Sequence, residues 1–255
     1  PDFLKARFQL AKTFVLQIRT GSRYDREILD TADAMIKDVL ANNPDSAKAH
    51  GIRSVIAVAK GMLNLGKKYA KEAYRLNPND SEIIIFHAMI NKDDIGENKI
   101  RALYKRALNI DPLNGEIFAS YAIYLERTLH NFSEAETAYK RAIELTPNNA
   151  SFKAGLGIFY IQNMGNLDEA FKLIEVASKQ DPNDPDFVQI LSIMYLELGD
   201  EQQALEYADK AIALDPRADS IEPKILVLTS LGETGKALKL VNDTLDDPDI
   251  EYRDT

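Results

Sequence analysis

The sequence has no cysteine and no tryptophan, and only 3 of its 255 residues are histidine. The lack of cysteine excludes disulfide bonds, zinc–thiolate sites, iron–sulfur clusters and thiol nucleophiles. No uninterrupted apolar run approaches the roughly 18 residues that a membrane-spanning helix requires, so we expect no membrane span. The first ten residues match neither a secretory nor a mitochondrial targeting pattern. Because the sequence starts at Pro1 rather than at methionine, we interpret it as a processed chain or as part of a longer one.

Negative charge dominates the sequence, which has a formal net charge of −9 at pH 7. The charge is unevenly distributed, because residues 1–75 carry a net +6 and residues 76–255 carry a net −15. Nucleic-acid backbones select basic surfaces, so we expect no nucleic-acid partner. The best place for an anionic contact is a basic cluster formed by Lys60, Lys67, Lys68 and Lys71.

Proline recurs along the chain at intervals of 32 to 35 residues. The series consists of Pro44, Pro78, Pro112, Pro147, Pro182, Pro216 and Pro248. Alanine recurs in phase with it, either five or twelve residues before most of the prolines. These alanines are Ala73, Ala107, Ala142, Ala177 and Ala211, and Ala32, Ala135, Ala170 and Ala204. A fixed period of this length is typical of proteins built from stacked repeats.

Each repeat is predicted to form two antiparallel helices. The segments before the prolines, such as residues 168–180, have apolar residues at the i, i+3, i+4 and i+7 spacing of an amphipathic helix. Proline then ends the helix, because it has no backbone N–H and restricts the residue before it. Alanine at fixed positions allows a neighbouring helix to approach closely.

Local signals refine the predicted helix boundaries. Pro223 is expected in the first turn of a helix, where proline is tolerated. Capping pairs are predicted at the starts of three second helices, at Ser133 with Glu136, Asn166 with Glu169, and Asp200 with Gln203.

The repeat pattern resembles the tetratricopeptide repeat (TPR) family. The resemblance rests on the 34-residue period, on the alanine and proline positions, and on turns such as MGNLDEAF (164–171) and LGDEQQAL (198–205). It implies an all-α fold, a right-handed superhelical solenoid of about seven helix-turn-helix repeats, with a concave wall formed mainly by the first helix of each pair. We expect a single solenoid over residues 1–255, with an extension of the first helix at 1–12 and repeats at 13–46, 47–80, 81–114, 115–149, 150–184, 185–218 and 219–252.

The sequence offers no catalytic motif. The segment GETGKA (232–237) lacks the first glycine and the hydroxyl residue of a phosphate-binding loop. The three histidines, His50, His87 and His130, lie in different repeats, so we expect structural or surface roles for them. We therefore predict that the protein is not an enzyme, and we expect no catalytic residues, no cofactor and no metal.

Binding is the predicted activity, and the concave wall is its predicted place. The inner-wall residues are unusually apolar, which favours a protein or peptide partner with an apolar or amphipathic segment. The predicted partner-binding residues are Ile52, Val55, Ile85, Phe86, Met89, Ile123, Ile158, Ile190, Ile193 and Val227. A register error of one residue would instead bury these side chains between helices, so the exposure of Ile85, Met89 and Ile193 tests the prediction.

One known mode of partner binding in the family is not expected. Family members that hold the acidic carboxyl tails of heat-shock chaperones use Lys, Asn and Arg on the inner wall. Here the corresponding positions are Gln17, Gly21, Ile52, Glu82 and Phe86.

Two alternatives to a free-standing scaffold remain open. The chain could be a sensor, regulatory or assembly module of a larger protein, such as a bacterial signalling or envelope protein. It could also self-associate into homo-oligomers, with the basic amino end of one copy docking on the acidic carboxyl end of the next. A cytoplasmic location is favoured over a periplasmic or secreted one.

Overall fold

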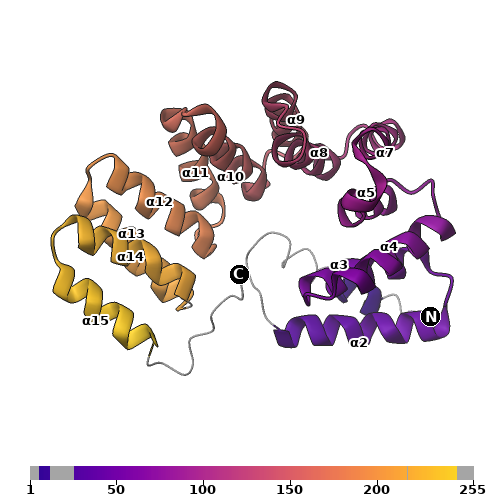
Figure 1. The fold of residues 1–255 in the computed structure, drawn as a ribbon, viewed down its shortest axis with the longest axis horizontal. Coiled ribbons are helices and arrows are strands. Elements are labelled where there is room, and N and C mark those ends of the chain that lie inside the picture. Colours follow the sequence, from indigo (N-terminus) through magenta and orange to yellow (C-terminus); the bar gives the residue numbers. More distant parts are fainter. Residues whose placement is uncertain (1–5, 12–25, 217, 246–255) are drawn as a thin grey trace. The chain divides into compact units, whose positions relative to one another are not determined.

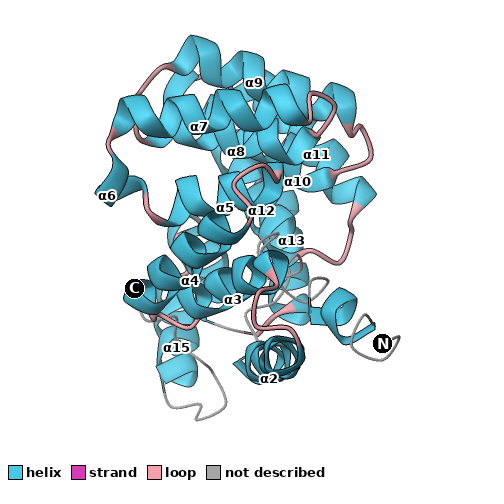
Figure 2. Cartoon of the chain, turned by 90° about the vertical axis from the view of Figure 1, so that its right-hand side faces the viewer, coloured by secondary structure: helices cyan, strands magenta, loops and turns pink. Residues whose placement is uncertain are grey.

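The computed structural model describes residues 6–11, 26–216 and 218–245 of the chain. All regular secondary structure in these ranges is helical, as expected from the repeat pattern (Figures 1 and 2). The chain divides into two compact units, Pro1–Pro147 and Asn148–Thr255. Gln17, Gly21, the expected first helix of repeat 13–46 and the acidic residues after position 245 lie outside the described residues.

The first unit is a stack of helices joined by short turns. Within it α3 packs on α4, α8 packs on α9, and α5 contacts both α7 and α8. Its helices are α2 (Arg26–Asn42), α3 (Ala47–Ala59), α4 (Leu63–Leu76), α5 (Ser81–Ile90), α6 (Lys92–Ile95), α7 (Glu97–Ile110), α8 (Gly115–Arg127) and α9 (Phe132–Leu145).

The second unit contains three helix pairs, formed by α10 with α11, α12 with α13 and α14 with α15. Its elements are α10 (Ala150–Phe159), the π-helix η1 (Tyr160–Met164), α11 (Leu167–Gln180), α12 (Pro185–Glu197), α13 (Glu201–Leu214), α14 (Ala218–Ser230) and α15 (Thr234–Leu245). Successive pairs also contact each other, because α11 packs on α12 and α13 packs on α14. Each unit is therefore a helical repeat fold.

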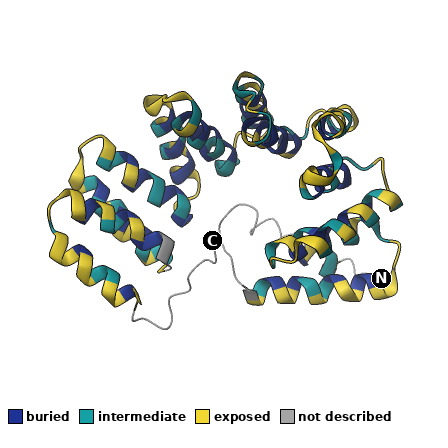
Figure 3. Cartoon of the chain, in the orientation of Figure 1, coloured by how far each residue is buried: buried dark blue, intermediate teal, exposed yellow. Residues whose placement is uncertain are grey.

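Small residues lie where helices cross. The alanines of the periodic series are completely buried, and buried residues lie on the helix faces that meet neighbouring helices (Figure 3). Two glycines permit a closer approach than alanine would. A Cβ atom added to Gly66 would lie 2.5 Å from Val58 Cγ2, and one added to Gly157 would lie 2.8 Å from Ile174 Cδ1. The prediction that small residues set the helix crossings is confirmed.

Side-chain caps begin most of the described helices. Two predicted pairs are confirmed, because Asn166 accepts a hydrogen bond from the Glu169 N–H at 3.4 Å and Asp200 accepts one from the Gln203 N–H at 3.1 Å. The prediction at Ser133 was wrong. Asn131 caps α9 instead, accepting from the backbone N–H of Glu134. The helix therefore begins two residues earlier than the Ser-x-x-Glu pattern indicated.

Pro223 also differs from the expectation. It is the sixth residue of α14, beyond the first turn. A proline at that position cannot donate the helical hydrogen bond that the other residues of the helix interior make. Pro223 is buried in the second unit, so its packing contacts partly compensate for the missing hydrogen bond.

The turn between the helices of each described pair contains one residue in the left-handed backbone region. In the α8–α9 pair this residue is His130, with φ of 50°. An L-amino acid there costs about 1–2 kcal/mol relative to a right-handed conformation. The other pairs use Gly61, Gly96, Gly165, Gly199 and Gly232, with φ between 63° and 84°.

The pair at residues 150–180 contains one residue more than the pair that follows it. The N-capping residues Asn149 and Asn166 are 17 positions apart, whereas Asp184 and Asp200 are 16 apart. The π-helix η1 accommodates the additional residue, because its turns are wider than those of an α-helix. The backbone N–H of Asn166 reaches back to the carbonyl oxygen of Tyr160 at 3.3 Å.

Candidate functional site

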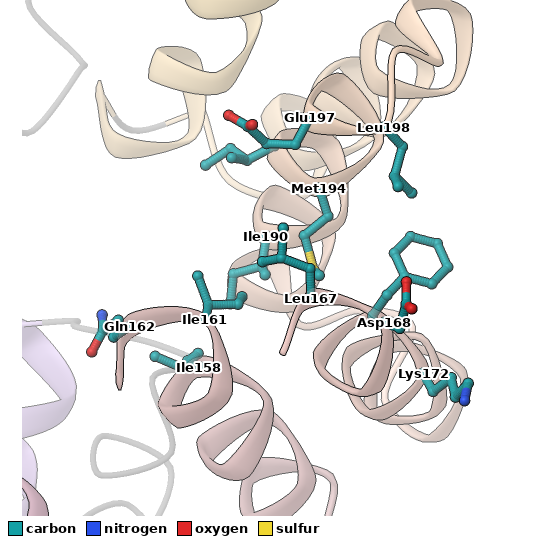
Figure 4. Close-up of a pocket in the computed structure, with 12 residues that line it drawn as sticks. Ile158, Ile161, Gln162, Leu167, Asp168, Lys172, Ile190, Met194, Glu197 and Leu198 are labelled. Atoms are coloured by element: carbon teal, nitrogen blue, oxygen red, sulfur yellow. The ribbon is translucent and has the colours of Figure 1, made fainter. Parts of the chain in front are cut away.

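An open pocket of about 640 Å³ lies within the second unit, between α10, η1, α11 and α12 (Figure 4). Its size is in the range of ligand pockets, which are usually about 300–1,000 Å³. The residues that line it are Ile158, Ile161, Gln162, Leu167, Asp168, Phe171, Lys172, Ile190, Ile193, Met194, Glu197 and Leu198.

Apolar side chains from four consecutive helical elements, α10, η1, α11 and α12, form the wall of the pocket. In Figure 4 Ile161, Leu167, Ile190 and Met194 lie next to one another around the cavity. Several of the wall residues reach solvent, and Ile193 is 39% exposed. Single exposed apolar residues are common on protein surfaces, but a contiguous group around a hollow indicates a binding site.

The charged groups at the pocket are mostly acidic. Asp168 on α11 and Glu197 on α12 line it, and within the part of the chain that the structure describes neither carboxylate forms an ion pair. Lys172 also lines the pocket, and its Nζ lies 3.4 Å from the Glu169 carboxylate. Residues 150–197 contain three lysines and seven acidic residues, so the sequence around the pocket is acidic overall.

The structure brings three of the predicted partner-binding residues together at this pocket. Ile158 belongs to α10, and Ile190 and Ile193 belong to α12. The sequence prediction placed all three on first helices, and the structure places them on the first helices of two successive pairs, around one pocket. Their role in binding a partner remains a prediction.

Four other predicted residues lie inside the helical packing, each with no more than 5% of its surface exposed. They are Ile52, Ile85, Phe86 and Val227. The predicted inner wall is wrong at these positions, because a buried side chain cannot contact a partner. The segment IIIF at residues 83–86 is apolar on every side of α5, and such a helix is surrounded by other helices.

Three further predicted residues belong to the first unit and are not among the residues that line the pocket. Met89 and Ile123 are 38% and 40% exposed, and Val55 is half-buried. Of the three residues chosen as a test, Met89 and Ile193 are exposed and Ile85 is buried. The substitution Ile85→Asp would therefore place a charge in the core and destabilise the fold, so it would not report on partner binding.

The sequence prediction missed the contribution of the second helix. Leu167, Asp168, Phe171 and Lys172 come from the first two turns of α11. The sequence contained one signal for this helix, because Leu167 is an apolar residue at the otherwise polar start of a second helix. In the structure Leu167 is 48% exposed. The prediction assigned partner binding to first helices alone and therefore passed over it.

The basic cluster of the first unit is largely engaged with carboxylates. Lys67 and Lys71 donate hydrogen bonds to the two oxygens of Asp94, at 2.8 and 2.9 Å. Both hydrogen bonds lower the pKa of the Asp94 carboxyl, and the one from Lys67 has the larger effect. Lys60 pairs with Asp30. This cluster therefore has less free positive charge than the sequence indicated.

The three histidines belong to the first unit, and none of them lines the pocket. The ring of His87 stacks on Tyr74 with centroids 4.4 Å apart, and burial lowers its pKa. His50 Nε2 lies 2.8 Å from the carbonyl oxygen of Pro44. In the ranges that the structure describes, no group of three or more His, Asp or Glu side chains is placed to hold a metal ion. No helix in those ranges has both the length and the apolar character to cross a membrane.

Comparison with known proteins gives matches at two levels. Tetratricopeptide repeat models match residues 127–192 and 187–217. No curated protein matches the chain. Among solved structures, PilF of Pseudomonas aeruginosa has a TM-score of 0.64 and 16% identity, over 79% of this chain and 91% of that chain.

Two other solved structures are similar. PilW, a type IV pilus biogenesis factor, has a TM-score of 0.65 and 17% identity, over 80% of this chain and 95% of its own. A thermophilic TPR protein of Thermus thermophilus has a TM-score of 0.61 and 18% identity, over 74% of this chain and 99% of its own. Identities this low show a shared fold. The family models identify tetratricopeptide repeats within residues 127–217, and the structural neighbours have the same helical repeat fold.

Proposed function

We propose that the protein is a non-catalytic interaction scaffold that binds an apolar segment of a partner protein in the pocket between α10, η1, α11 and α12. The main support for this proposal is the pocket itself, where apolar side chains from these four helical elements surround an open cavity of about 640 Å³. The fold supports it, because repeat arrays bind partners on surfaces built from successive units.

The energetics favour a short apolar segment as the occupant. Fully burying one leucine-sized side chain contributes about 1.5–3 kcal/mol, and a cavity of this size has room for more than one. Immobilising the segment costs part of that gain. We therefore expect dissociation constants in the micromolar range, about −8 kcal/mol, for peptides of a dozen or so residues.

Ile193→Asp tests the proposal directly. Peptides selected from a random library on the wild-type protein should bind this variant at least tenfold more weakly, because the new carboxylate would lose water on contact with the apolar segment. Fluorescence anisotropy with labelled peptides measures the change.

Val176→Asp is the matched control. Val176 lies on α11 in the same unit, is 40% exposed against 39% for Ile193, and does not line the pocket. Selected peptides should bind this variant like the wild type. Equal binding to Ile193→Asp and wild type, or equal losses in both variants, would contradict the proposed site.

A further inference from the structure

We infer that the partner segment in this pocket is basic, with its apolar residues flanked by lysine or arginine. The inference rests on the proposed function and adds the chemistry of the partner. It is drawn from the carboxylates at the pocket and from the charge of the unit that carries it.

Two carboxylates at the pocket are free to pair with a partner. Asp168 comes from the first turn of α11 and Glu197 from the end of α12, so they belong to different helix pairs and both border the apolar wall. No ion pair engages either of them in the described ranges. A cation held beside a bound apolar segment would be shielded from water, and its attraction to these groups would exceed that of an ordinary surface pair.

The pocket has few cationic groups that could pair with an acidic partner. Among the described residues, Lys172 is the one cation that lines it, and that lysine already pairs with Glu169. Helix α12 contains no lysine or arginine. Residues 148–255 carry nine basic and twenty-one acidic residues, so the field of the whole unit attracts cations and repels anions.

A second copy of the same pocket is a poor occupant for the same reason. A two-fold symmetric contact would place Asp168 and Glu197 of one copy against the same residues of the other. Like charges brought together at an interface are unfavourable. A foreign basic segment avoids this repulsion.

Two synthetic peptides test the inference. They share the same leucine residues, and the flanking positions are all lysine in one peptide and all glutamate in the other. The lysine peptide should bind the wild-type protein at least tenfold more tightly at about 50 mM salt, and the difference should shrink at about 500 mM as salt screens the charges.

Charge-reversed variants locate the effect. Asp168→Lys combined with Glu197→Lys should abolish or reverse the preference for the lysine peptide. Glu206→Lys combined with Asp243→Lys changes the net charge of the unit equally, at exposed positions away from the pocket, and should keep most of the preference. If the two double variants lose the preference equally, the pocket carboxylates do not cause it and the inference fails.

Ile193→Asp distinguishes binding in the apolar pocket from selection of a basic partner. If both peptides bind wild type equally and both lose affinity in Ile193→Asp, the pocket binds apolar segments without charge selection, and only the basic-partner inference is overturned. If Ile193→Asp changes the affinity of neither peptide, the proposed function fails with it.

Discussion

Replacing Phe159 with alanine is expected to lower the free energy of unfolding by about 3–5 kcal/mol, the range for large aromatic side chains removed from protein cores. Phe159 is completely buried at the end of α10, immediately before η1, and its ring centroid lies 5.8 Å from that of Tyr160. The truncation would leave a cavity beside the π-helix. Stability in a repeat array depends on contacts between neighbouring helices, so the loss would spread to α11 and α12.

Urea unfolding followed by far-ultraviolet circular dichroism measures this loss. Leu238→Ala serves as the control, because Leu238 on α15 is 59% exposed and should change the free energy of unfolding by no more than about 0.5 kcal/mol. A loss below about 1 kcal/mol for Phe159→Ala would show that the helices around Phe159 are not packed as described.

Asp184→Asn is expected to stabilise the protein at neutral pH. Asp184 caps α12 and is only 3% exposed. Burial, together with the neighbouring charges of Asp186 and Asp181, raises the pKa of its carboxyl from 3.8 to about 6. Asparagine keeps the side-chain oxygen that accepts from the Asp186 N–H at 2.9 Å, and it removes the buried charge.

The sign of the pH dependence follows from the raised pKa. Between pH 4 and pH 6 the folded protein binds more protons at Asp184 than the unfolded chain does, so the stability of the wild type falls as pH rises through this range. The free-energy cost of keeping the ionised Asp184 carboxylate buried levels off above pH 6, at about 1–3 kcal/mol. The favourable interaction of a carboxylate with a helix N-terminus, typically about 0.3–1 kcal/mol, offsets part of this cost.

Thermal or urea unfolding of both proteins between pH 4 and pH 8 tests this expectation. The two stability curves should nearly coincide near pH 4 and separate by about 1–3 kcal/mol above pH 6, with Asp184→Asn the more stable protein. A variant that is less stable at pH 7.5 would show that the ionised carboxylate makes a stabilising contact that asparagine cannot replace.

The helix pairs were predictable because packing repeats its demands at a fixed period. Each crossing needs a small residue, and each second helix ends before proline, so alanine and proline recur together in the sequence. The additional residue in the pair at 150–180 was visible only as a longer spacing between Pro147 and Pro182. No local sequence signal indicates the π-helix η1, which accommodates this residue in the structure.

The candidate site was predictable only in part. Ile190 and Ile193 were among the predicted residues because the repeat register placed them on the inner wall of a first helix. The structure places both at the pocket. Ile85 was misplaced because α5 is apolar all round, and periodicity cannot choose a face on such a helix. Leu167 and Phe171 were missed because they belong to a second helix, α11, and the prediction considered first helices alone.

Isoleucine-methyl NMR spectra of the full chain, recorded with and without a selected peptide, show directly whether the pocket binds the peptide. The largest chemical-shift changes are expected at Ile158, Ile161, Ile190 and Ile193, the isoleucines of the pocket. The methyl group of Ile123, which is exposed in the first unit, should remain unchanged. Changes centred on Ile123, with the four pocket methyl groups unaffected, would show that the peptide binds elsewhere and that the pocket is not the binding site.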